Sequence, residues 1–122
     1  MSGFTESLGI KPGDSVVVLD DGNTIFRRLS IEAPEDVALQ KRVLGDRVEM
    51  IIVRIGEGQD TGQLFKRIQQ GIKPDGVIWA VSHANNAELL AGALEAGLIE
   101  TDTISFSEEE VGVRFVREEK HR

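Results

Sequence analysis

The amino-acid sequence predicts an α/β fold, a three-layer sandwich in which helices lie on both sides of a mostly parallel sheet. Three apolar runs rich in β-branched residues, at 15–19, 48–55 and 77–81, lack polar alternation. Strands covered on both faces have this pattern. Segments with helical spacing separate the runs, and a repeated strand, helix, strand order folds with right-handed crossovers around one sheet.

The chain is expected to enter the first strand through a short helix and a turn. Gly9 is placed to end that helix, and residues 11–14 have turn chemistry. Beyond the first strand, residues 24–30 have the spacing of a short helix. The alternation of apolar and polar residues over 37–43 predicts a half-exposed strand near the edge of the sheet.

The middle of the chain predicts a capped helix between two buried strands. Asp60 or Thr61 caps this helix, and Gln63 is placed to complete a capping box from Asp60. Residues 73–76 are expected to form a turn that leads into the next strand. That strand holds Trp79, which we expect in the core because its neighbours are all apolar.

The last third of the chain predicts one helix and an antiparallel pair of strands. The helix covers residues 87–96, with Gly97 as its C-cap. An acidic segment joins the strands at 103–107 and 111–117, which favours antiparallel pairing. Residues 118–122 are expected to form a frayed tail.

The composition limits the class of protein. The 122 residues suit a single domain over residues 1–122. The absence of cysteine excludes a thiol nucleophile and a thiolate metal site. A net charge of −7 repels phosphate backbones and anionic lipids, so neither nucleic acid nor a membrane is expected as a partner. No apolar run approaches the ~20 residues of a membrane span and no signal peptide is evident, so a cytoplasmic location is expected.

Four segments carry a family resemblance. They are the lead-in to the first strand at residues 8–14, the helix, Lys-Pro turn and strand within 66–81, the helix end at 95–99, and the strand pair at 105–116. Together they resemble class I S-adenosylmethionine methyltransferases. The length of the chain is nearer to that of a bacterial family of small, uncharacterised proteins that keep a reduced methyltransferase-like sheet. The resemblance implies a Rossmann-like fold with a terminal antiparallel strand.

The resemblance also implies a place for a cofactor. In open α/β sheets, ligands bind beyond the carboxyl ends of the strands, where the strand order reverses. That crevice is expected between the first strand and the strand ending at Ile55, and three loops would converge there. The candidate cofactor-binding residues on these loops are Asp20, Gly22, Gly56, Gly58, Ser82 and His83. The cofactor that the resemblance implies is S-adenosylmethionine.

The cofactor pattern after the first strand is incomplete. Methyltransferases of this class carry an acid and a run of glycines there, so that the backbone can approach the methionine part of the cofactor. Asp20 and Gly22 fit, but Thr24 and Phe26 stand where further glycines are expected. Residues 20–23 are also compatible with a plain tight turn.

A second acid, which binds the ribose hydroxyls, is expected after the next strand. The residues there are Leu44 and Gly45, and Asp46 is only a loose substitute. The sequence therefore predicts a degraded cofactor site.

A dinucleotide site is disfavoured by spacing and by charge. Gly56, Gly58 and Gly62 lie between a strand and a helix, but the third glycine comes one residue late for the fingerprint. Glu57 and Asp60 would also repel a pyrophosphate at the helix N-terminus. A plain helix cap is the favoured interpretation.

The pair Asp20 and Asp21, with Ser82 after a later strand, also resembles the receiver domains of two-component signalling. Those domains hold Mg²⁺ beside an acceptor aspartate. No aspartate ends the strand at 48–55, so the chain would be at most a pseudo-receiver. In a receiver the last strand would lie parallel to the others.

His83 is the only histidine outside the tail, and it follows Ser82 at a strand end, where catalytic bases occur. Adjacent residues of a strand point to opposite sides, and the Gly-x-Ser-x-Gly elbow is absent. A histidine that caps the next helix is the favoured interpretation. A metal site built from Asp20, Asp21, Glu57 and His83 has no spacing to support it, so no metal is expected.

The leading hypothesis is a bacterial binding or interaction module whose methyltransferase-like domain performs no methyl transfer. Its partner would be a protein or a small molecule. The alternative is a minimal S-adenosylmethionine-dependent methyltransferase, with an adenosine-sized pocket beside Asp20, Gly22 and Ser82. Thr24 and Phe26 filling that space would favour the module. Dimerisation through an edge strand or the outer helices is common for small sheets, and the sequence leaves the face open.

Overall fold

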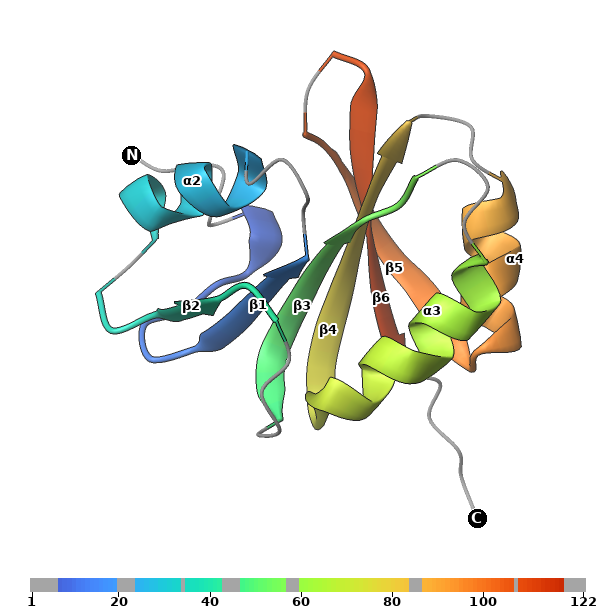
Figure 1. Cartoon of the computed structure of the whole chain (residues 1–122), viewed down its shortest axis with the longest axis horizontal. Coiled ribbons are helices and arrows are strands. Elements are labelled where there is room, and N and C mark those ends of the chain that lie inside the picture. The colour runs from blue at the N-terminus through green and yellow to red at the C-terminus, as the bar shows by residue number, and fades with distance from the viewer. Residues whose placement is uncertain are drawn as a thin grey trace.

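The computed structural model describes residues 7–19, 24–33, 35–42, 47–56, 60–83, 87–106 and 108–117. These residues form one six-stranded sheet with the strand order β2-β1-β3-β4-β6-β5 (Figure 1). The strands are β1 (Ser15–Leu19), β2 (Ala38–Gln40), β3 (Val48–Arg54), β4 (Ile72–His83), β5 (Leu98–Ser105) and β6 (Glu110–Arg117). The helices are α2 (Thr24–Glu32), α3 (Thr61–Ile68) and α4 (Ala87–Glu95), and a 3₁₀ turn, η1 (Gln69–Gly71), follows α3.

The strand directions confirm the predicted fold class. β1 pairs in parallel with β2 on one side and with β3 on the other, and β3 pairs in parallel with β4. β6 runs antiparallel to both β4 and β5. The sheet is therefore mostly parallel, with antiparallel strands at the end of the chain. The pseudo-receiver alternative is wrong, because it requires a parallel last strand.

Apolar side chains alternate between the two faces of the sheet and form two cores. In β3, Ile51 and Val53 point toward α3 and α4, whereas Ile52 points toward α2. We call the first the α3–α4 core; it comprises Val17, Val48, Ile51, Val53, Ile55, Leu64, Phe65, Ile68, Ile72, Ile78, Ala80, Leu89, Ala93, Leu98, Val113 and Phe115. The second, the α2 core, comprises Leu8, Ile10, Val16, Val18, Ile25, Leu29, Met50, Ile52, Val77, Trp79 and Val81.

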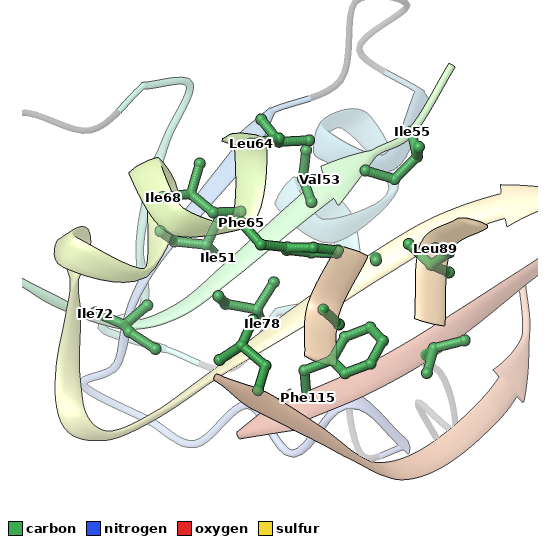
Figure 2. Close-up of a cluster of buried hydrophobic side chains, with 14 of the residues drawn as sticks. Ile51, Val53, Ile55, Leu64, Phe65, Ile68, Ile72, Ile78, Leu89 and Phe115 are labelled. Carbon is green, nitrogen blue, oxygen red and sulfur yellow. The ribbon is translucent and has the colours of Figure 1, made fainter. Parts of the chain in front are cut away.

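Aromatic side chains occupy the middle of both cores. In the α3–α4 core, the rings of Phe65 and Phe115 lie 5.4 Å apart, and side chains from both helices and from the sheet converge around them (Figure 2). Trp79 is fully buried in the α2 core, which confirms its predicted place. Its Nε1–H donates to the carbonyl of Leu8 at 3.0 Å and so attaches the segment before β1 to the sheet.

The turn predicted at residues 73–76 is wrong, because β4 runs through this segment as a bulged strand. Val48 pairs with Ile72 and Met50 pairs with Val77, so the step of two residues along β3 matches a step of five along β4. Gly76 allows this crowding, since a Cβ on it would stand 2.9 Å from the Cβ of Ile72. Bulges insert unpaired residues without ending the strand.

Two further strand ends differ from prediction. β5 begins at Leu98, earlier than the predicted residue 103, because Gly97 adopts φ +86° and turns the chain directly from α4 into the sheet. Residues 99–103 are exposed, as suits an edge strand, so they carry little alternation to detect. β2 ends at Gln40 instead of residue 43. The predicted tail at 118–122 lies outside the described residues.

The N-cap predicted at Asp60 agrees with the structure. Asp60 is the N-cap of α3, and its carboxylate accepts the backbone N–H of Gln63 at 3.1 Å. Among the helices of the described ranges, none is long and apolar enough to cross a membrane.

Candidate functional site

The strand order reverses at β1. The chain passes from β1 to β2 on one side and then returns to place β3 on the other side of β1. Such a reversal opens a crevice at the carboxyl ends of the two central strands. Here these ends are Leu19 of β1 and Arg54 of β3, so the reversal falls where the sequence analysis placed the candidate site.

The structure describes only some of the residues that were predicted to bind a cofactor at this crevice. Asp20, Gly22 and Gly58 lie outside the residues that the structure describes. Gly56 follows β3 and is exposed. Ser82 and His83 are the last two residues of β4, so they also lie at the carboxyl edge of the sheet. Their role in binding a cofactor stays a prediction.

Ser82 is buried, with 2% of its surface exposed. Along β4, Ala80 belongs to the α3–α4 core and Val81 to the α2 core, so alternation directs the Ser82 hydroxyl toward the α3–α4 side. The backbone of His83 pairs with Glu110 of β6.

The carboxyl end of β2 carries positive charge. The residues that follow Gln40 are Lys41 and Arg42, and both are exposed. The Lys41 ammonium lies 5.0 Å from the centre of the Phe26 ring, within the range of a cation–π interaction. Phe26 itself is half-buried on α2 and packs against the α2 core. The acid expected at residues 44–46, with Asp46 as its loose substitute, lies outside the described residues.

The resemblance implies a carboxylate after β2 that accepts hydrogen bonds from the ribose hydroxyls, whereas an ammonium has donors only. The described residues directly after β2 offer Lys41 over an aromatic ring. An aromatic side chain also stands at position 26, where the methyltransferase pattern expects a glycine.

An ion pair joins the carboxyl edge of the sheet across β4. The guanidinium of Arg54, the last residue of β3, binds the carboxylate of Glu110, the first residue of β6. β4 lies between these two strands in the sheet. The side chains are 29% and 21% exposed, so the pair is partly shielded from water.

Sequence reasoning did not find this pair. Arg54 and Glu110 lie 56 residues apart in the chain, and no local pattern links them. The one feature of the sequence that could have indicated this pair is the predicted antiparallel pairing of the last strand. In that pairing the start of the last strand lies at the carboxyl edge of the sheet.

The N-terminus of α3 is occupied by carboxylates. The Asp60 side chain caps it, and a Cβ on Gly62 would stand 2.6 Å from Oε1 of Glu95, so the Glu95 carboxylate also lies close to this helix end. Glu95 further lies 4.0 Å from the ammonium of Lys66. Negative groups at a helix N-terminus satisfy the attraction that would otherwise draw a phosphate. The geometry thus favours the helix-cap interpretation.

Comparison with known proteins identifies the fold. A methyltransferase from Aquifex aeolicus described as SAM-dependent matches with a TM-score of 0.71 and 11% identity over 93% of this chain and 87% of that one. A TehB-like SAM-dependent methyltransferase from Corynebacterium glutamicum matches at 0.67, with 10% identity over 96% and 87% of the two chains. A ribosomal protein L11 methylase from Lactobacillus delbrueckii subsp. bulgaricus matches at 0.66, with 14% identity over 93% and 74%.

The chain therefore has the fold of class I S-adenosylmethionine-dependent methyltransferases. No family model matches the sequence, and no curated protein matches it either. At such low sequence identity the likeness establishes the fold, and the activity must be argued from the site.

Proposed function

We propose that this chain is a non-catalytic binding or interaction module built on a methyltransferase-like fold. The observation that carries the proposal is the contact between Lys41 and Phe26 at the carboxyl end of β2. A cation and an aromatic ring at this strand end support the proposal, because the resemblance implies a hydrogen-bond acceptor and glycines near these positions. A fold of this kind can serve binding alone, since its function depends on the site and not on the scaffold.

The ion pair between Arg54 and Glu110 supports the same proposal. The guanidinium of Arg54 engages the carboxylate of Glu110, and β4 lies between their two strands. Both side chains are thus committed to joining strand ends at the carboxyl edge of the sheet.

The test is thermal unfolding with and without millimolar S-adenosylhomocysteine. A ligand at 100 times its dissociation constant adds about 2.7 kcal/mol, which raises the midpoint of a domain of this size by several degrees. We expect no change in the midpoint. A rise that Asp20→Ala abolishes would overturn the proposal in favour of the minimal methyltransferase. Asp75→Ala is the matched control, since this exposed acid lies at the opposite edge of the sheet.

A further inference from the structure

An apolar groove opens between α4 and β5 on the side of the sheet that carries the α3–α4 core. It has a volume of about 260 Å³ and is lined by Leu90, Leu94, Leu98, Ile99, Glu100 and Phe115. Leu94 is 68% exposed and Leu90 is 39% exposed, so α4 presents apolar surface to solvent beside this hollow. Apolar side chains around a hollow, with few polar groups among them, are typical of ligand sites.

The strand register places the Glu100 side chain on the groove side of the sheet. Glu100 pairs with Phe115 of β6, and residues directly opposite each other on paired antiparallel strands share a face. Phe115 belongs to the α3–α4 core and also lines the groove. Asp102 pairs instead with Arg114, which lies opposite Trp79 of the α2 core. The groove therefore has Glu100 as its acid, and Asp102 belongs to the other face.

The charge of Glu100 is not compensated at the groove. Its carboxylate accepts a hydrogen bond from the neutral hydroxyl of Thr103 at 3.1 Å. In the part of the chain that the structure describes, no lysine or arginine binds this carboxylate. A single negative charge beside apolar side chains is complementary to a ligand that has an apolar body and one positive charge.

The shape of the groove suits a small molecule better than a protein chain. A bulge at Thr101 interrupts β5, because Glu100 and Asp102 pair with consecutive residues of β6, and bulged edges pair poorly with an added strand. A two-fold contact between copies would set the two Glu100 carboxylates against the same apolar surface. At about 30 Å³ for each non-hydrogen atom, as in liquid water, the groove holds roughly nine such atoms.

We propose that the groove between α4 and β5 binds a small amphipathic amine. The aliphatic or aromatic part of the amine lies between Leu94 and Phe115, and its ammonium group binds the carboxylate of Glu100. This inference rests on the proposed function and gives the binding module a ligand of defined chemical class.

The experiment is a titration of the full chain with 2-phenylethylamine, followed through the amide resonances in nuclear magnetic resonance spectra. The amine is of the size that the groove accepts and is positively charged at neutral pH. Saturable shifts are expected at the amides of the groove residues. The neutral isostere 2-phenylethanol should bind about fivefold more weakly, because it lacks the charge that pairs with Glu100, and the anion phenylacetate should bind more weakly still.

Variants separate the two parts of the ligand. Glu100→Gln should lower the affinity for the amine about fivefold, to that of the alcohol. Asp102→Asn is the matched control, since it removes an exposed acid of the same strand from the opposite face and should change neither affinity. Leu94→Asn should weaken amine and alcohol alike, because it removes apolar surface. Equal binding of amine and alcohol, equal effects of the two acid variants, or no saturable shift with millimolar amine would overturn the inference.

The two proposals can fail separately. A midpoint shift with S-adenosylhomocysteine contradicts the proposed function whatever the amine does. Absence of amine binding, with no such midpoint shift, contradicts only the ligand inferred for the groove.

Discussion

The ring of Phe106 lies over Gly112, so close that a Cβ on Gly112 would stand 2.6 Å from the Cδ1 atom of the ring. Phe106 follows β5, and Gly112 lies on β6 beside Val81 of the α2 core. The same ring lies 6.5 Å from that of Trp79. Phe106 thus extends the α2 core across β6, and glycine at position 112 makes the space for it.

This contact predicts that Gly112→Ala destabilises the wild-type chain more than it destabilises a chain that lacks the Phe106 ring. Gly112→Ala should lower the free energy of unfolding by about 1–3 kcal/mol, because the added methyl must displace the ring. In a chain that already carries Phe106→Ala, the same substitution should have little effect. Urea unfolding followed by circular dichroism measures both values. Equal losses in the two backgrounds would show that the ring does not constrain Gly112.

The packing of α3 against α4 predicts a sensitive glycine in α4. A Cβ on Gly92 would stand 2.7 Å from the Cβ of Thr61 and 2.8 Å from the backbone nitrogen of Gly62. Alanine normally stabilises a helix by about 1 kcal/mol relative to glycine. Here Gly92→Ala should instead destabilise the protein by about 1–3 kcal/mol, because the helices must separate.

Its control is Ala91→Ser on the exposed side of α4. That substitution should change stability by no more than about 0.5 kcal/mol. Differential scanning calorimetry measures both variants. A raised melting temperature for Gly92→Ala would mean that the helices have room for the methyl group.

The hydrogen bonds of Glu49 predict a pH dependence. The Glu49 carboxylate binds the Lys73 ammonium and accepts the backbone N–H of Ser15 at 2.6 Å. These contacts, first the one with Lys73 and then the one with Ser15, hold the pKa of Glu49 below its ordinary value of 4.5. A carboxyl whose pKa is lowered by folding stabilises the protein above its unfolded pKa, and this contribution is lost as the pH falls through the folded pKa.

Glu49→Gln should therefore be less stable than the wild type at neutral pH, and the difference should shrink as the pH falls below 4.5. Glu35→Gln, which changes an exposed acid, is the control. Urea unfolding at a series of pH values measures the difference. A gap between Glu49→Gln and wild type that stays constant into acid would contradict the role of Glu49.

The ion pair at the crevice predicts a measurable coupling. A double-mutant cycle with Arg54→Met and Glu110→Gln should give a coupling free energy of about 1 kcal/mol, because the pair is partly shielded from solvent. The exposed pair of Arg28 and Glu32 on α2, at 3.2 Å, is the comparison and should give about 0.3–0.5 kcal/mol. Additive effects of Arg54→Met and Glu110→Gln would show that the two strand ends are not joined energetically.

The buried strands could be predicted from the sequence because their pattern is local. Residues 15–19 form a strand that is covered on both faces of the sheet. An uninterrupted run of mostly β-branched residues is enough to predict such a strand. The N-cap at Asp60 could likewise be predicted, because it depends only on residues within one turn of the helix. The bulge at Gly76 is different, because it depends on pairing with β3, more than twenty residues away in the chain.

The candidate site could be placed but not described from the sequence. Its position follows from strand order, which the alternation of strands and helices already implies. Its chemistry depends on where β2 ends, which set Lys41 beside Phe26, and on the return of β6, which set Glu110 beside Arg54. Short strand ends and contacts between distant strands leave no periodic pattern in the sequence.

The hydrogen bond from Trp79 to Leu8 makes the intrinsic fluorescence of this chain a local probe. Trp79 is the only tryptophan, so its emission comes from a single indole whose N–H is held by the segment before β1. Detachment of that segment would admit water to the indole and shift its emission, even while every strand stays paired. An emission change that precedes the loss of circular dichroism would reveal an N-terminal segment that leaves the sheet before the domain unfolds.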